Sequence, residues 1–292
     1  MSTVTAVRPG HVVDVTRAQL FGLVRRPAAW TIVAAMIVLN QVFSFLIPYL
    51  SYRSSDPSGF DAGSTPEELL AGTLPAQIVT NTLGGFPVFA GALALALGAL
   101  VLGSEYGWGT FKTVVTQRPG RGSVLAGQLL AVLVFIAGTV AVLFAMSALT
   151  STVIAVAEDQ SAALPGIGHL ASGYAGGVLI LSTWAAIGAA LAVALRSVAL
   201  PVGLGIVWAL GIENLVSAMT STMLSALEPV RDVLPGVNAG SLVAALTPER
   251  IGSPAPGVAE TVGSAQALTT LLGYLLIAGV VAAWCHQRRD VT

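Results

Sequence analysis

The sequence predicts an all-α polytopic membrane protein with six transmembrane helices, and three observations lead to this fold class. The chain has 292 residues, of which 55% are hydrophobic and only 9% are charged, whereas soluble domains carry about a quarter charged residues. Apolar runs of roughly 20 residues recur along the chain, and each is long enough to cross a bilayer as a helix. The basic residues between these runs segregate to one side, as they do in membrane proteins of fixed orientation.

Six apolar segments are expected to span the membrane within a single transmembrane domain that covers residues 1–292. Their expected limits are residues 28–50, 78–103, 124–150, 173–195, 198–218 and 265–285. The connecting segments then alternate between the two sides of the membrane. Residues 1–27, 104–123, 196–197 and 286–292 fall on the first side. Residues 51–77, 151–172 and 219–264 fall on the second side.

The distribution of the basic residues tests this alternation of the connecting segments between the two sides. The chain has 13 basic residues, and only Arg53, Arg231 and Arg250 fall on the second side. The others all fall on the first side: Arg8, Arg17, Arg25, Arg26, Lys112, Arg118, Arg121, Arg196, Arg288 and Arg289. Because basic residues near membrane spans stay in the cytoplasm, both termini are predicted to be cytoplasmic and the protein to lie in the cell membrane. Of the acids, all except Asp14, Glu105 and Asp290 fall on the outer side, counting Glu213 at the outer end of the fifth span.

The segment 1–27 is expected to contain an amphipathic helix over residues 12–26. At 100° per residue, six residues share one arc: Val12, Val13, Thr16, Leu20, Leu23 and Val24. Four charged residues lie outside that arc: Asp14, Arg17, Arg25 and Arg26. Val15 and Phe21 break the pattern. Such a helix would lie in the inner membrane interface with its arginines toward lipid phosphates; the alternative is a basic flank that only satisfies the orientation rule.

The second span carries a row of glycines. Gly84, Gly91 and Gly98 recur at intervals of seven, nearly two helical turns, and the same register then reaches Glu105. Small residues let two helix backbones approach closely inside a membrane. This seam favours tight packing within one subunit, with a subunit contact or a translocation path as the alternative. Pro87 in the same span should kink it.

The last outer loop, residues 219–264, is long and only partly polar. The stretch SAMTSTMLSALEPV, residues 217–230, has helical apolar spacing, and TPERIGSPAPG, residues 247–257, is rich in turn-forming residues. We expect short helices that dip back into the membrane interface. A flexible surface loop is the competing interpretation.

The sequence lacks the patterns of a catalytic site. His11, His169 and His286 cannot share a metal by local spacing, and neither H-E-x-x-H nor G-x-S-x-G occurs. The single cysteine, Cys285, excludes an intrachain disulfide. No catalytic residue, no metal site and no nucleic-acid partner are therefore expected.

ATP hydrolysis by this chain alone is also unexpected. A phosphate-binding loop of the G-x-x-x-x-G-K-[ST] type needs glycine before its lysine, but Phe111 precedes Lys112, the only lysine. Ion-coupled transport usually needs ionisable groups near the midplane of the bilayer. The only such candidate, Glu213, is predicted near the outer surface. Hence no cofactor is expected in this chain.

The densest polar cluster is GSEYGWGTFKTVVTQRPGRGS, residues 103–123, between the second and third spans. Trp108, Phe111 and Val115 form one apolar stripe of a short helix, and Lys112 lies away from it. This cytoplasmic elbow, residues 104–123, is predicted to lie along the inner membrane surface and to dock a cytoplasmic partner. A basic loop that only satisfies the orientation rule is the alternative.

The elbow resembles a known family. The pattern Glu105-x-x-x-Gly109-Thr110, followed by Arg118, Pro119 and Arg121 before an apolar span, is similar to the first cytoplasmic elbow of type-2 ABC transporter permeases. That family includes bacterial drug, antibiotic and polysaccharide exporters and the G-type half-transporters. The basic helix before the first span, the tight Arg196-Ser197 hairpin and the long loop before the sixth span fit it as well. Gln128 departs from the pattern, since a lysine commonly stands near there.

The resemblance implies a permease subunit of an ATP-driven exporter, working with a separate ATPase subunit that binds ATP and Mg and with a second permease copy or paralogue. It implies that the elbow and the N-terminal helix rest on the ATPase and couple its closure to the spans. The coupling residues would be Glu105, Gly109, Thr110, Lys112, Arg118, Arg121 and Arg17. In the family, substrate passes mainly between the second and fifth spans. By that analogy Asn81, Phe86, Phe89 and Trp208 would face substrate, with core packing as the alternative role.

The substrate itself is expected to be apolar or amphipathic, because the spans offer alkyl and aromatic groups with few charges. Multidrug or antibiotic efflux would fit this description. A non-transport scaffold or sensor subunit that docks a partner through the same elbow is the alternative function. An intramembrane enzyme is disfavoured by the missing catalytic patterns.

Overall fold

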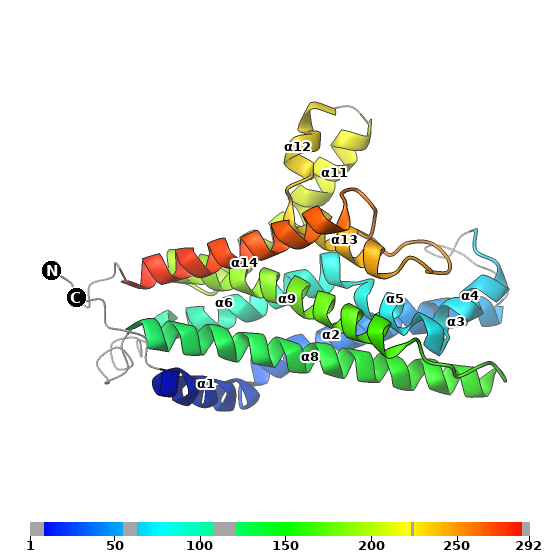
Figure 1. Ribbon diagram of the computed structural model, residues 1–292, viewed down its shortest axis with the longest axis horizontal. Helices are drawn as coiled ribbons and strands as arrows, with labels where there is room; N and C mark the ends of the chain where they lie inside the picture. Colours follow the sequence, from blue (N-terminus) through cyan, green and yellow to red (C-terminus); the bar gives the residue numbers. More distant parts are fainter. Residues whose placement is uncertain (1–8, 55–62, 108–120, 223–224, 288–292) are drawn as a thin grey trace.

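The computed structural model describes residues 9–54, 63–107, 121–222 and 225–287 (Figure 1). Those residues form helices and connecting turns, with no strand among them. Within this part of the chain, six helical segments are long and apolar enough to cross a membrane: Pro27–Ser54, Pro75–Ser104, Gly122–Ala157, Ile167–Leu195, Ala199–Thr220 and Ser264–Cys285. The predicted all-α fold with six spans is confirmed. The largest differences are that span three continues to Ala157 and that span four begins at Ile167.

Several spans consist of more than one helical piece. The first half of the chain has these elements: α1 (Pro9–Val24), α2 (Pro27–Gln41), η1 (Val42–Leu46), α3 (Ile47–Ser54), α4 (Pro66–Thr73), η3 (Pro75–Gln77), α5 (Ile78–Leu83), η4 (Phe86–Ala90), α6 (Gly91–Gly107) and α8 (Arg121–Ala157). The second half has these: α9 (Ile167–Leu195), α10 (Ala199–Ile206), η5 (Val207–Ile212), α11 (Glu213–Thr222), η6 (Ser225–Leu227), α12 (Glu228–Arg231), α13 (Pro235–Leu246) and α14 (Ser264–Gln287).

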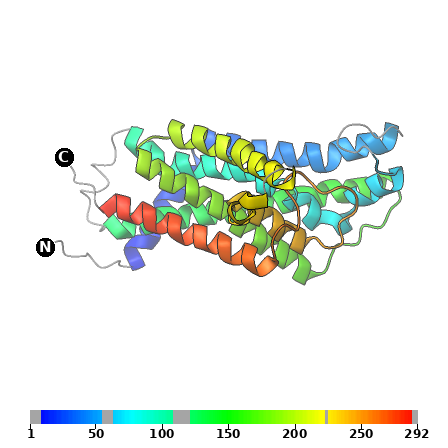
Figure 2. The same ribbon diagram turned by 90° about the horizontal axis from the view of Figure 1, so that it is seen from above.

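The spans lie side by side in an elongated bundle (Figures 1 and 2). The helix α1, the start of α8 and the last turns of α6, α9 and α14 gather at one end, which we call the terminal end. The helices α3 and α4 lie at the opposite, distal end. Consecutive spans therefore run antiparallel, as six spans with alternating connections require.

Spans two and four form the centre of the bundle. In each, 67% of the most apolar stretch is buried, against 17% in spans one and six and 22% in span five. The backbones of α6 and α9 touch: a methyl group at Gly98 would fall on the carbonyl of Ala185, and one at Gly188 on the carbonyl of Leu95. Glycine is needed at both positions because only a hydrogen fits between the two helices.

Span five begins packed in the bundle and projects away from it at its other end. Its first piece, α10, packs against α6 and α9, whereas α11 and the following α12 project away from the other helices (Figure 1). Several large apolar side chains of this span are exposed: Leu204, Val207, Trp208 and Leu215. The span therefore presents apolar side chains that no other described part of this chain covers.

A helix is present at the N-terminus as expected, but its packed face differs from the predicted arc. Thr16 and Leu23 are buried, whereas Val13 and Val24 are exposed. Val15, which breaks the predicted pattern, lies against Gly127 of α8, and the Thr16 hydroxyl donates to the Gly127 carbonyl at 3.2 Å. The packed face of α1 is thus set by its contact with α8, which a helical-wheel pattern does not contain.

The long loop before span six folds back into the bundle, but through a different segment from the predicted one. The stretch 217–230 continues span five in α11 and then forms η6 and α12. The returning segment is α13, which packs against α9 and α14; Asn238, Ser241 and Val243 are almost completely buried there. A flexible surface loop is therefore wrong for residues 235–246.

Candidate functional site

Span two is interrupted near its middle. The helix α5 ends at Leu83, and the π-helical turn η4 begins at Phe86 after Gly84 and Gly85. Pro87 lies in that turn and has no backbone N–H to continue the helical ladder. The kink predicted from Pro87 is thus present as a break in the helix. Such a break leaves backbone carbonyls that side chains from other spans can bind.

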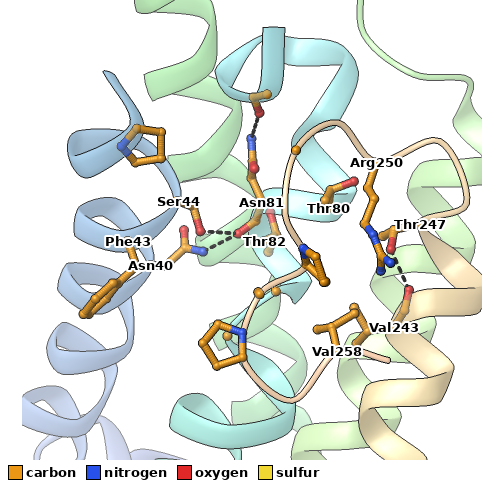
Figure 3. A pocket seen from close by; sticks show the side chains of 18 of the residues that line it. Asn40, Phe43, Ser44, Thr80, Asn81, Thr82, Val243, Thr247, Arg250 and Val258 are labelled. Carbon is orange, nitrogen blue, oxygen red and sulfur yellow. Dashed lines mark hydrogen bonds between the residues drawn. The ribbon is translucent and has the colours of Figure 1, made fainter. Parts of the chain in front are cut away.

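Side chains of span one satisfy the backbone beside this break. The Asn40 amide donates to the Asn81 carbonyl at 2.7 Å, and the Ser44 hydroxyl donates to the same oxygen at 2.8 Å (Figure 3). The Asn81 side chain donates to the Gly72 carbonyl of α4 at 2.8 Å. From span three, the Ser147 hydroxyl donates to Asn40 Oδ1 at 3.1 Å. One hydrogen-bonded network therefore joins spans one, two and three to α4.

A cavity of about 360 Å³ opens next to this network. Its walls come from span one, from α5 and η4 of span two, and from the loop that follows α13 (Figure 3). Phe43 and Phe89 stack on one wall with ring centroids 5.9 Å apart and planes inclined by 7°. The cavity is thus mainly apolar with a few fixed polar groups, which is the usual character of a small-molecule site.

The loop after α13 is held firmly against the rest of the molecule. The Gln77 side chain donates to the Glu249 carbonyl at 3.0 Å. Gly257, at φ +83°, lies against Val88 of η4. The left-handed backbone there favours glycine, and a side chain at Gly257 would also meet Val88. The loop therefore forms a fixed wall, and it carries Arg250, the one arginine among the described residues that line the cavity.

Three of the four residues predicted to face substrate lie together here. Asn81, Phe86 and Phe89 all line the cavity, although Phe86 is only 1% exposed and mainly packs in the core. Trp208 lies elsewhere, in η5 of span five, where it is 42% exposed. Its indole N–H donates to Glu213 at 2.7 Å. Within one chain, spans two and five therefore do not share this cavity.

Glu213, whose predicted place near the outer membrane surface stays a prediction, is a buried carboxyl group of span five. It is only 4% exposed, and its second carboxylate oxygen accepts the Gly236 N–H at 2.7 Å. Gly236 lies in the first turn of α13, where unpaired backbone N–H groups and the helix dipole favour an anion. Glu213 thus joins span five to the returning helix. Sequence reasoning missed this contact because its partner lies 23 residues away in a different element.

The predicted glycine seam is divided by the break in span two. Gly98 faces the Ala185 backbone, and Gly91 faces the indole of Trp184, both in α9. Gly84 instead faces Ala255 in the loop after α13. The seven-residue register therefore does not continue through Gly84–Gly85. For Gly91 and Gly98, the contacts lie within one subunit, which favours the packing interpretation.

Of the predicted ATPase-coupling residues, the three that the structure describes lie at the terminal end. Arg17 is exposed on α1. Glu105 lies in the last turns of α6, and Arg121 begins α8. The rest of the set falls outside the described residues: Gly109, Thr110, Lys112 and Arg118. The structure does not describe an elbow helix, and this part of the site stays a prediction.

A contact that sequence reasoning missed lies beside the elbow. The Arg26 guanidinium donates to the Ser104 hydroxyl at 2.8 Å, linking the turn between α1 and α2 to the end of span two. Ser104 directly precedes Glu105. The sequence gives little indication of this hydrogen bond, because an arginine at a membrane edge is expected to face lipid phosphates rather than a serine. The N-terminal helix and the start of the elbow are therefore tied together.

Spans one and three are joined at the distal end. Glu158 accepts hydrogen bonds from Tyr49 at 2.6 Å and Tyr52 at 3.1 Å, and it pairs with Arg53 at 3.3 Å. The hydrogen bond from Tyr49 is the main cause that lowers the pKa of Glu158. Its contribution to stability is therefore present above the ordinary glutamate pKa and is lost as the pH falls through the lowered value.

Among the described residues, no three His, Cys, Asp or Glu side chains gather where a metal ion would need them. In a comparison with protein families, a family model described as "ABC-2 family transporter protein" matches residues 20–291. The match takes in all six spans and the loops between them. No curated protein matches the chain.

Proposed function

The chain belongs to the ABC-2 family of transporter proteins, and we propose that it is the permease subunit of an ATP-driven exporter. In this proposal it moves an apolar or amphipathic substrate outward, using ATP that a separate ATPase subunit hydrolyses. Family membership supports the permease role and an association with an ATPase subunit and the membrane. The mainly apolar cavity beside the break in span two supports the proposal of an apolar or amphipathic substrate.

Contact with the ATPase is assigned to the terminal end. Arg17 is exposed on α1, and the Arg26–Ser104 hydrogen bond ties the α1–α2 turn to the end of α6. Force applied to α1 or to the elbow would therefore reach span two through a direct contact. ATP and Mg belong to the partner subunit in this scheme, and the present chain supplies only the surface that receives its movement.

A second permease copy is assigned to the face of span five. Leu204, Val207 and Leu215 are exposed apolar residues of this span, and its last piece, α11, projects from the bundle (Figure 1). Two copies related by symmetry would bring Trp208 of one chain toward the other. In this arrangement the substrate path lies between copies.

A transport assay tests the proposal. The chain is purified from its native membrane with any bound ATPase, and the complex is reconstituted in liposomes with fluorescent amphipathic compounds. We expect outward transport that depends on ATP, and stimulation of the ATPase by at least one transported compound. A complex with a hydrolysis-deficient ATPase is the matched control and should transport nothing. If the ATPase binds but no compound is moved or stimulates it, the scaffold or sensor function is correct instead.

A labelling experiment tests the proposed orientation. Cys285 is first replaced by serine, and single cysteines are then placed at Ser161, Ser253 or Ala18, which are exposed in the structure. In intact cells, an impermeant thiol reagent should label the variants at Ser161 and Ser253, because few basic residues flank those segments. The variant at Ala18 should react only after the cells are opened. External labelling at Ala18 contradicts cytoplasmic termini.

A further inference from the structure

The cavity contains an arginine without a described partner. The other two arginines of the predicted outer side form ion pairs, Arg53 with Glu158 and Arg231 with Asp232. The Arg250 guanidinium, by contrast, makes no hydrogen bond or ion pair with any residue that the structure describes. Arg250 is also half-buried. A cation in such a place is unfavourable unless something neutralises or hydrates it.

The surroundings of Arg250 combine charge with apolar surface. It lies beside Thr247 on the wall formed by the loop after α13, and the aromatic side chain of Phe43 lies on the other side of the cavity (Figure 3). Phe43 stacks on Phe89. Because Gln77 fixes the neighbouring Glu249 carbonyl, the backbone that carries Arg250 is held in place. The cavity therefore offers a cation at one end and an aromatic wall at the other.

Among the described residues that line the cavity, Glu68 is the one acid, and it is already engaged. Glu68 Oε2 accepts the Thr65 N–H at 2.9 Å, and Thr65 in turn accepts the Glu68 N–H at 3.2 Å. This is a capping box at the start of α4, where the helix dipole favours a carboxylate. Glu68 therefore stabilises its own helix and does not neutralise Arg250.

We propose that this cavity binds an anionic amphiphile, whose carboxylate or phosphate group pairs with Arg250 and whose apolar part lies along Phe43 and Phe89. An arginine can form two parallel hydrogen bonds with either anion. The inference deepens the proposed export function, since it names the charge of the molecule that the cavity takes. Binding itself needs neither the ATPase nor transport.

The test measures binding to the purified full-length chain in nanodiscs of zwitterionic phosphatidylcholine. The probe is a lysophosphatidic acid with one 14-carbon chain, and a monoacylglycerol of the same chain length, which carries no charge and no phosphate, is the neutral comparison. We expect Arg250→Gln to weaken binding of the anionic probe at least tenfold, equivalent to about 1.4 kcal/mol, and to leave the neutral probe unchanged. Arg250→Lys should retain most of the affinity because the charge remains.

Two further variants are matched controls. Arg231→Gln removes an arginine from the same predicted side but outside the cavity, and it should bind the probe like the unaltered chain. Glu68→Gln keeps a side chain that can complete the capping box while removing a negative charge from the cavity. It should bind the anionic probe equally or more tightly. Weaker binding of the anionic probe by Glu68→Gln would show that the net charge of the cavity does not govern its binding, and it would overturn the proposal.

Competition distinguishes the sources of the anion. If anionic phosphatidylglycerol in the nanodisc displaces the probe in an Arg250-dependent manner, the natural occupant is a membrane lipid. If it does not, the occupant is a free amphiphile. Inorganic phosphate alone should compete weakly in both cases, because it lacks the apolar part. Equal affinity of Arg250→Gln and the unaltered chain for the anionic probe overturns the inference, whereas failed transport with intact binding contradicts only the export function.

Discussion

Replacing Gly98 with alanine is expected to destabilise the protein by about 1–3 kcal/mol, the usual range for overpacking a well-packed core. The added methyl group would fall on the backbone carbonyl of Ala185, which cannot rotate away as a side chain can. The two central helices, α6 and α9, would have to separate. Alanine is otherwise favoured over glycine in a helix by about 1 kcal/mol. The expected decrease in the free energy of unfolding is therefore the cost of overpacking minus this gain.

Gly138→Ala is the matched control for this prediction. Gly138 lies within α8, and a methyl group there would meet nothing within 4 Å. Thermal unfolding in detergent should therefore show a lower midpoint for Gly98→Ala and an unchanged or higher midpoint for Gly138→Ala. Gly188→Ala, which would meet the Leu95 carbonyl across the same contact, should resemble Gly98→Ala. If Gly98→Ala unfolds like the control, the backbones of α6 and α9 do not touch.

The six spans could be predicted from sequence because the bilayer imposes its own thickness on every crossing helix. An apolar run between charged flanks, such as Ser264–Cys285, has nearly the same limits in the sequence and in the structure. Span three continues to Ala157, beyond its predicted end. A helix that packs against neighbours can continue past the hydrocarbon core of the bilayer. Hydropathy sets the position of a span in the membrane but not the full length of its helix.

The details of packing were less predictable because they depend on contacts between distant segments. The heptad spacing of Gly84 with Gly91 and Gly98 suggests one seam, but the break at Gly84–Gly85 turns Gly84 toward Ala255. Likewise the buried face of α1 follows its contact with α8 at Gly127. Periodicity assumes one uninterrupted, isolated helix, and both assumptions fail at these positions.

The candidate cavity also combines residues that could be predicted from the sequence with residues that could not. Family analogy pointed to Asn81 and Phe89, which do line it. Arg250 entered the sequence reasoning only as a charge that helped to fix topology. Its importance depends on being half-buried and on lacking a described partner, and neither property has a local sequence signal. Gly257, where the loop lies against Val88 of span two, also cannot be singled out from the sequence, because the chain has 32 glycines.

Reversing two charges of the elbow is expected to release the ATPase. Arg118→Glu with Arg121→Glu should weaken its binding by more than tenfold, because opposite charges across the contact become like charges. Co-purification at low salt measures the effect. The matched control is Arg288→Glu with Arg289→Glu, the same change in net charge on the same predicted side, which should leave the ATPase bound.

Glu105→Ala is expected to give a different defect in the same region. Glu105 follows Ser104, whose hydroxyl accepts from Arg26, so it occupies the point where span two, the N-terminal helix and the elbow meet. A carboxylate at the membrane edge is stable only when it is hydrated or paired, and its loss should change the angle of the elbow to span two. The ATPase should then stay bound and hydrolyse ATP, while transport per ATP hydrolysed falls at least tenfold. Binding and transport at unaltered levels in both the Arg118/Arg121 and the Glu105 variants would show that the elbow only satisfies the orientation rule, and that force reaches span two through α1 and Arg26 alone.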